Sequence, residues 1–153
     1  MPEWQLTTAA TVERARAVFE VHRDRLREHG VPGELELTGG SSVAGLLTKG
    51  DIDLHLRVPS SDFAVAVAEL RLLYAAVLPD IWTGTFAVFE EDAMPPVGIA
   101  VTAIASEHDR RFTRSWERMR SDAAARERYN ALKRAGGDVE EAKSRFFDEL
   151  TEE

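Results

Sequence analysis

The chain has 153 residues, 44% hydrophobic and 30% charged, a composition typical of one globular domain. It contains no cysteine, which excludes disulfides, thiol catalysis and cysteine-ligated zinc and fits a reducing compartment. The formal net charge of −8 disfavours a broad nucleic-acid-binding surface, because a negative field repels phosphate groups. The N-terminal segment lacks the pattern of a signal peptide, and no run approaches the roughly 20 apolar residues that span a bilayer. We therefore expect a cytoplasmic protein without a membrane segment.

The first third of the chain combines a helix, a strand and a turn. Apolar side chains at helical spacing predict an amphipathic helix over residues 8–29, which ends at Gly30. Polar and apolar side chains alternate over 34–38, which predicts a short strand with one buried face. Two glycines and two serines form a turn at 39–42, and one or two helical turns are expected to follow over 42–47.

The middle of the chain has the clearest strand pattern. Residues 51–58 alternate strictly, with Ile, Leu, Leu and Val on one face and Asp, Asp, His and Arg on the other. A serine cap at 60 or 61 predicts a mostly buried helix that runs to about 77. Two further strands are expected over 81–89 and 97–104, joined by a hairpin loop over 90–96.

The last third is predicted to be helical, with Gly136 and Gly137 as a break. The three expected helices cover roughly residues 107–121, 122–134 and 138–150. The order of elements indicates an α+β fold, in which helices cover a mixed β-sheet. We expect a single domain, with a core over about 1–105 and C-terminal helices over about 106–153.

Asp51 and Asp53 form the first candidate site. Residues at i and i+2 on a strand project from the same face, so the two carboxylates are expected to lie side by side. Adjacent like charges repel unless a cation lies between them, and a hard divalent ion with oxygen ligands, such as Mg²⁺, meets that need. An exposed strand face that simply carries acids explains the same pair without a metal.

The segment Gly39, Gly40, Ser41 and Ser42 is the second candidate, because it follows a strand and is expected to open a short helix. Glycines let the backbone approach a phosphate, a helix N-terminus offers unpaired N–H groups, and a serine hydroxyl adds a donor. An ordinary strand-to-helix turn with a serine cap explains the loop equally simply. The loop and the acidic pair on the next strand together favour a joint phosphate and metal site.

The segment GGSSVAGLLTKGDIDLHLRV, residues 39–58, resembles the Gly-Ser, spacer, Asp-x-Asp pattern of the DNA polymerase beta-like nucleotidyltransferase superfamily. Within that superfamily the chain is most similar to the GrpB family, whose corresponding segment is GSTSVPGLAAKPIIDI. The matching residues are Gly39, Ser42, Val43, Gly45, Leu46, Lys49, Ile52 and Asp53. A second match lies in the C-terminal third, where the family pattern of Tyr, Leu-Lys, Lys and Phe falls on Tyr129, Leu132, Lys133, Lys143 and Phe146.

The resemblance implies a nucleotidyltransferase fold in which catalytic Asp51 and Asp53 hold Mg²⁺ (or Mn²⁺) against the phosphates of a nucleoside triphosphate. It implies transfer of a nucleotidyl group to an acceptor hydroxyl. A degenerate member would instead bind a nucleotide, another phosphorylated small molecule or a partner protein without turnover. The residues that would contact phosphate or base are Lys49, Lys133, Lys143 and Tyr129. Without the resemblance, Lys133 and Lys143 on the C-terminal helices would be interpreted as a solvated basic face. Lys49, two residues before the acidic pair, could contact a phosphate or offset the carboxylates, and the alternative is an exposed loop lysine.

The sequence departs from the superfamily at the third carboxylate, which active members usually supply from a later strand. The strand expected over 97–104 contains no acid, and it also lacks the histidines associated with that strand in the GrpB family. Glu90 is the best acid at the other end of the hairpin, because it shares a strand face with Phe86 and Val88. Glu90, Glu91 and Asp92 cluster there, and a solvated loop tip is the better interpretation of this cluster.

His55 continues the face of Asp51 and Asp53 by one step. It is a candidate metal ligand, proton shuttle or phosphate contact, and the alternative is a polar residue on a half-exposed strand. The three tryptophans are interpreted as core residues rather than ligand platforms. They are Trp4, Trp82 and Trp116. The sequence does not determine the oligomeric state.

Overall fold

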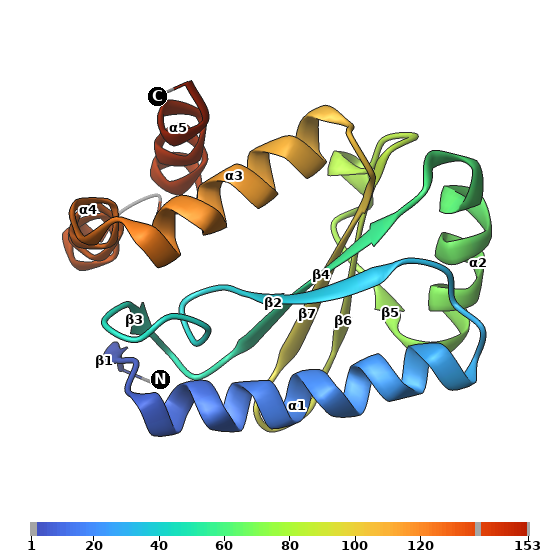
Figure 1. Ribbon diagram of the computed structural model, residues 1–153, viewed down its shortest axis with the longest axis horizontal. Coiled ribbons are helices and arrows are strands. Elements are labelled where there is room, and N and C mark those ends of the chain that lie inside the picture. Colours follow the sequence, from blue (N-terminus) through green and yellow to red (C-terminus); the bar gives the residue numbers. More distant parts are fainter. Residues whose placement is uncertain (1–2, 137–138, 153) are drawn as a thin grey trace.

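The computed structural model describes residues 3–136 and 139–152. Within these residues, five strands form one mixed sheet in the order β2-β4-β7-β6-β5 (Figure 1). Their bounds are Glu34–Thr38 for β2, Ile52–Val58 for β4, Ala75–Ala76 for β5, Phe86–Glu91 for β6 and Val97–Ala103 for β7. Strands β4 and β7 run parallel, and the other neighbours are antiparallel. A separate antiparallel pair joins β1 (Gln5–Leu6) to β3 (Leu47–Thr48).

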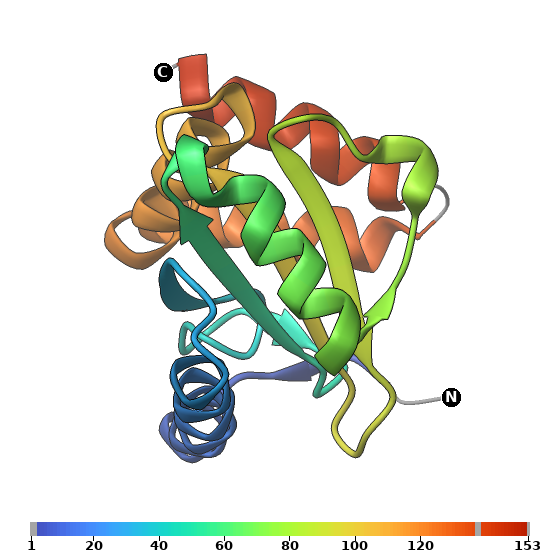
Figure 2. The same ribbon diagram turned by 90° about the vertical axis from the view of Figure 1, so that its right-hand side faces the viewer.

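Helices cover both faces of the sheet (Figures 1 and 2). Helices α1 (Ala9–Glu28) and α2 (Phe63–Leu73) pack on one face. The other face lies under the C-terminal helices α3 (Glu107–Ser121), α4 (Ala123–Ala135) and α5 (Val139–Glu152). Two short 3₁₀ helices, η1 (Ser60–Asp62) and η2 (Pro79–Ile81), lie in the connections. The α+β fold with a mixed, helix-covered sheet is therefore confirmed.

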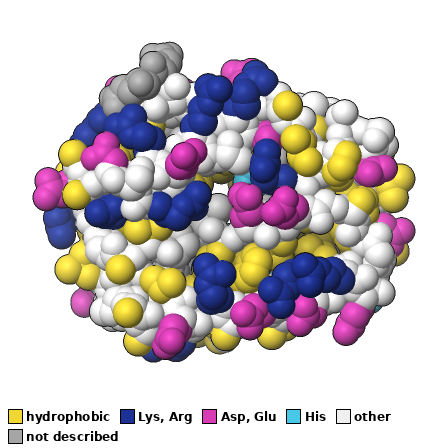
Figure 3. Space-filling model, viewed as in Figure 1, with side chains coloured by type: hydrophobic (Ala, Val, Ile, Leu, Met, Phe, Trp, Pro, Cys, Tyr) yellow, Lys and Arg dark blue, Asp and Glu magenta, His cyan; other side chains and the backbone are white. Residues whose placement is uncertain are grey.

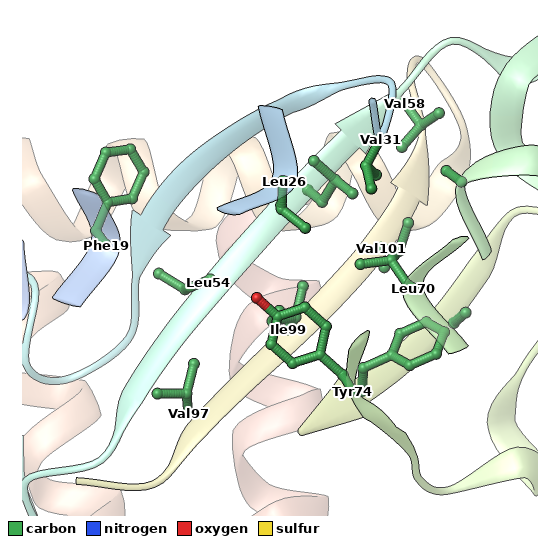
Figure 4. Packing of buried hydrophobic residues seen from close by; sticks show 14 of the residues in the cluster. Phe19, Leu26, Val31, Leu54, Val58, Leu70, Tyr74, Val97, Ile99 and Val101 are labelled. Atoms are coloured by element: carbon green, nitrogen blue, oxygen red, sulfur yellow. The ribbon is translucent and has the colours of Figure 1, made fainter. Parts of the chain in front are cut away.

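The main hydrophobic core lies between the sheet and the first two helices (Figure 4). The four apolar residues of β4 point into it, as their alternation predicts, and none is more than 4% exposed. Phe19 and Leu26 of α1 and Leu70 of α2 pack against them. The polar face of β4 is thereby turned toward the C-terminal helices.

A second core holds those helices together. It is built around Trp116 of α3, Tyr129 of α4, and Phe146 and Phe147 of α5, and Leu46 reaches it from the loop before β3. The aromatic rings lie about 6 Å apart in tilted and edge-on pairs, the arrangement that the ring quadrupole favours. In the part of the chain that the structure describes, no helix is both long and apolar enough to span a bilayer.

Most element bounds are confirmed to within a few residues, but the segment 42–47 is not helical. It consists of turns and a bend, and then enters β3. The reason is pairing with β1, because Thr7 donates to the Leu46 carbonyl and Gly45 donates to the Thr7 carbonyl. These long-range bonds satisfy the backbone groups that a helix would otherwise satisfy locally.

Three further predictions around the middle strands are wrong. Helix α2 ends at Leu73, because the backbone becomes extended at Tyr74 and the next two residues pair with β6. Neither Ser60 nor Ser61 caps this helix, since no side-chain cap bond exists at η1 or α2. Strand β6 begins at Phe86, because the turn at η2 precedes it. The expected break at Gly137 and the helix start at 138 lie outside the described residues.

Candidate functional site

A pocket of about 1120 Å³ opens where the N-terminal end of β4 faces helices α4 and α5. Seven of the residues predicted for the site line it, and they come from three separate parts of the chain. They are Gly40, Lys49, Asp51, Asp53, Tyr129, Lys133 and Lys143. Gly39 borders Asp53 from a smaller adjoining cavity, whereas Ser41, Ser42, His55 and Glu90 do not line this pocket.

Asp53 is positioned on β4 between two residues without side chains. Its neighbour in register on β2 is Thr38, whose hydroxyl donates to the Asp53 carbonyl. Gly39 follows Thr38 with φ +82°, and a β-carbon at 39 would collide with the Asp53 carboxylate. On the other side, Gly98 of β7 is the register partner, and a β-carbon there would lie 3.6 Å from Asp53 Oδ1. The carboxylate thus occupies space that a side chain at 39 would fill, whereas a β-carbon at 98 would only touch it.

Asp51 lies just before β4 and is exposed, so the acidic pair spans the start of the strand rather than its interior. Its carbonyl accepts a hydrogen bond of 2.8 Å from Ser41 Oγ, which holds this residue at the pocket. The same Oγ lies 2.7 Å from Thr48 Oγ1. The two carboxylates therefore line one pocket, as the i, i+2 spacing predicts.

The glycine–serine loop is built differently from the predicted phosphate cradle. The Ser41 side chain is buried and its hydroxyl is committed to Asp51 and Thr48, while Ser42 Oγ donates to the Gly39 carbonyl at 2.6 Å. Because no helix follows, the loop offers no helix N-terminus to an anion. The serines instead brace the loop, and Gly40 leaves space beside Lys133, whose Nζ would lie 3.0 Å from a β-carbon at 40.

The lysines supply positive charge opposite the acids. Lys133 is 9% exposed, donates from Nζ to the Leu47 carbonyl at 2.7 Å, and lies 4.2 Å from the ring centre of Tyr129. Lys143 Nζ lies 6.0 Å from the same ring, so Tyr129 contacts both ammonium groups through its π face. Lys49 is exposed at the rim. The predicted phosphate contacts therefore converge on one pocket.

Asn130 was missed by sequence reasoning, although it lies between the family-matched Tyr129 and Lys133. Its Nδ2 donates to the Gly45 carbonyl and its Oδ1 accepts from Leu47 N–H, both at 2.8 Å. These bonds join α4 to the loop before β3. The position of the lysines relative to the acids depends on this connection.

Within residues 3–136 and 139–152, no third carboxylate joins the pair in a metal-binding group. Among the described residues, no group of three or more Asp, Glu or His side chains is close enough to hold a metal ion. Gly98 of β7 pairs in register with Asp53 on one side and with Glu90 of β6 on the other. Glu90 therefore lies two strands away from Asp53, and its side chain is exposed. The residues present still fit Mg²⁺, because this ion is commonly held by one or two carboxylates while substrate phosphates and water complete its octahedron.

His55 lies outside the pocket, beneath α3, and is only 1% exposed. Thr102 Oγ1 donates its single proton to Asp109, so at 2.8 Å it accepts from His55 Nε2–H. Burial lowers the pKa of His55 to about 4, which keeps the ring neutral. The expectation of a half-exposed polar residue is wrong, and no metal-ligand geometry is present around the ring among the described residues.

Asp109 is the centre of this buried network and was not recognised in the sequence. It receives two hydrogen bonds from Arg57, at 2.7 and 2.9 Å, and one from Ala105 N–H. Burial raises the pKa of Asp109, but these bonds and that from Thr102 outweigh it, so the pKa is below its usual value. The network fixes α3 to the polar face of β4 and β7.

The interpretation of all three tryptophans as core residues is wrong for Trp4. Trp116 is buried in the second core and Trp82 packs against the first, but Trp4 is 36% exposed and lines the pocket. Its ring centre lies 4.5 Å from Lys49 Nζ and 4.8 Å from Lys133 Nζ. Residue type alone predicts burial for tryptophan, so nothing in the local pattern indicated this position.

A family model described as GrpB protein matches residues 1–152. The chain belongs to the GrpB family. The crystal structure of the conserved protein GrpB from Enterococcus faecalis resembles this GrpB chain over 98% of both chains, with 15% identity and a TM-score of 0.73. No curated protein matches the chain.

More distant structures share the nucleotidyltransferase fold with this GrpB chain. The Cid1 poly(U) polymerase bound to Mg 3′-dATP matches 83% of the chain at 12% identity, with a TM-score of 0.52. The GLD-2/RNP-8 complex matches 95% at 16% identity, with a TM-score of 0.54. The chain spans only 40% of the Cid1 chain and 58% of the matched chain in the GLD-2/RNP-8 complex, and at these identities the likeness concerns the fold alone.

Proposed function

We propose that this GrpB chain binds the Mg²⁺ (or Mn²⁺) complex of a nucleoside triphosphate in the large pocket and transfers a nucleotidyl group from it to an acceptor hydroxyl. The observation that carries the proposal is the pairing of charges within one pocket. Asp51 and Asp53 lie at the start of β4, and Lys133 and Lys143 come from α4 and α5. In a metal–polyphosphate ligand, the metal ion complements the two carboxylates and the phosphates complement the two lysines.

Each side chain then has a defined task. Asp51 and Asp53 would hold the metal, which when bound would neutralise charge on the transferring phosphate. Lys133, anchored on the Leu47 carbonyl, and Lys143 would bind phosphate oxygens as point charges. The braced loop would keep Gly40 and Asp51 at fixed positions during transfer.

The structural neighbours support this proposal through the fold. Cid1 is described as a poly(U) polymerase with a Mg-bound nucleotide, which is the chemistry proposed here. For this chain we propose a small molecule or a protein as the acceptor rather than a nucleic acid. On the face shown in Figure 3, Lys and Arg side chains are interspersed with Asp and Glu, and the net charge is −8. A cytoplasmic location stays a prediction from the absence of cysteine.

A second candidate function is nucleotide or phosphate binding without turnover. It is favoured because the described residues place no third carboxylate with Asp51 and Asp53, whereas transfer needs a group that accepts the proton of the incoming hydroxyl. Glu90 is the acid in the same row of the sheet as Asp53, with only Gly98 between them. If the wild-type chain releases pyrophosphate, Glu90→Gln tests Glu90 as the base: it should abolish turnover and spare binding.

The test measures thermal stabilisation and pyrophosphate release with each nucleoside triphosphate, in the presence of Mg²⁺ or Mn²⁺. The wild-type chain is compared with Asp51→Asn and Asp53→Asn, and with Asp80→Asn as an exposed acid outside the pocket. We expect metal-dependent stabilisation and release that only the first two variants lose. Stabilisation without release would establish the binding function, and no stabilisation by any nucleotide would refute both.

A further inference from the structure

Trp4 is held at the rim of the pocket by the short sheet that follows it. Strand β1 pairs with β3 through Gln5 with Thr48 and Leu6 with Leu47. Because β3 directly precedes Lys49, this pairing brings the Trp4 ring beside Lys49, in the loop that leads to Asp51. The ring is thus part of the pocket wall.

The surroundings of Trp4 differ from those of the other tryptophans. Trp82 packs on Phe89 and donates from its indole nitrogen to the Val77 carbonyl, and Trp116 packs on aromatic rings of the second core. Trp4 instead keeps 36% of its surface exposed and has ammonium groups over its ring. An exposed indole beside concentrated positive charge is the arrangement found in grooves that bind single-stranded nucleic acids, where a base stacks on an aromatic ring next to a phosphate contact.

The two lysines at this ring are not equivalent. Lys133 is buried and anchored by its bond to the Leu47 carbonyl. Lys49 is exposed, and its ammonium group contacts the ring of Trp4. A ligand can therefore displace Lys49 from the ring without breaking a buried hydrogen bond.

We propose that the indole ring of Trp4 stacks on the base of the bound nucleotide, and that Lys49 moves from the ring to the phosphates. This inference rests on the proposed function and identifies how the pocket distinguishes a nucleotide from inorganic polyphosphate. Met94, Pro95 and Pro96 of the β6–β7 loop line the same pocket and supply apolar surface for the base. Since every base has a π face, the pocket should accept purine and pyrimidine nucleotides with only a modest preference.

The experiment compares affinities for two probes, Mg-ATP and Mg-tripolyphosphate, which share phosphates but differ in the base. The variants are Trp4→Ala and Trp4→Phe, with Trp82→Phe as a tryptophan control outside the pocket. We expect Trp4→Ala to weaken Mg-ATP binding about tenfold or more while Mg-tripolyphosphate binding stays within about twofold. Trp4→Phe should retain part of the Mg-ATP affinity, and Mg-ATP should quench indole fluorescence in the wild type and in Trp82→Phe but not in Trp4→Phe.

Equal losses for both probes in Trp4→Ala would overturn the inference, because they would mean that the ring only supports the lysines. Lys49→Ala should weaken both probes, and unchanged affinity for both would overturn the proposed movement of Lys49. Failure of the wild-type chain to bind either probe would overturn the proposed function itself, and this inference with it. The two proposals therefore fail in distinguishable ways: if only the role of Trp4 is wrong, the wild-type chain still binds Mg-ATP, and if the proposed function is wrong, it binds neither probe.

Discussion

Gly39, which directly follows strand β2, lies against the carboxylate of Asp53 on the neighbouring strand β4. A β-carbon at this position would collide with Oδ2, and the positive φ of +82° is itself unfavourable for any residue with a side chain. The glycine that was predicted from the sequence to contact phosphate therefore also leaves room for the acidic residue, which the sequence did not indicate.

Gly39→Ala is expected to destabilise the chain and to impair metal binding by displacing Asp53. Gly45→Ala is the matched control, since Gly45 has φ +91° but no atom within 4 Å of the added β-carbon. Both variants should lose about 1–2 kcal/mol from the left-handed backbone, measured by urea unfolding. Only Gly39→Ala should also lose the metal-dependent rise in melting temperature. Equal behaviour of the two variants would argue against the contact with Asp53.

Asn130→Ala should loosen the loop before β3, because it leaves the buried Leu47 N–H and the Gly45 carbonyl without their side-chain partner. We expect a loss of about 1–3 kcal/mol in unfolding free energy. Ser144→Ala, which removes an exposed hydroxyl on α5, should change it by less than about 0.5 kcal/mol. Hydrogen exchange at the Leu47 amide gives a local measurement. Unchanged protection there in Asn130→Ala would contradict the proposed connection.

Asp109→Asn should be among the most destabilising substitutions in the chain. It removes the charge partner of Arg57 and disturbs the bonds to Thr102 and Ala105, and breaking a buried pair costs about 3 kcal/mol. Glu149→Gln, which breaks the exposed pair with Arg128, should cost less than about 1 kcal/mol. Chemical denaturation measures both. Similar small effects would mean that the buried network contributes little to stability.

His22 should make stability decrease as the pH falls. Its ring is buried against the Tyr74 hydroxyl, and burial, assisted by Arg25, lowers the pKa of His22 below 6.5. Below that value the unfolded chain takes up a proton that the folded chain does not, so stability present above pH 6.5 is lost on acidification. His22→Gln should reduce the slope of stability against pH below 6.5 by up to about 1.4 kcal/mol per pH unit. An unchanged slope in His22→Gln would contradict this role of His22.

The local patterns of the sequence correctly predicted most of the helices and strands. The alternation over 51–58 correctly separated the core face of β4 from its polar face, and helical spacing placed α1 and α3 closely. The resemblance to the GrpB family is confirmed over nearly the whole chain. These features are readable because periodicity and spacing are properties of consecutive residues.

Tertiary structure alone decided the roles of several polar and aromatic residues. Ser41 turns its hydroxyl to the backbone of Asp51, His55 is buried by the helix that carries Asp109, and Trp4 is left exposed at the pocket. Each outcome depends on segments far apart in the chain, as in the bond of Asn130 to Gly45, 85 residues away. The sequence by itself determined which residues alternate and which match the family. Only the packing of the C-terminal helices against β4 decided which of these residues share a pocket, because burial and hydrogen bonding depend on neighbours that spacing along the chain does not specify.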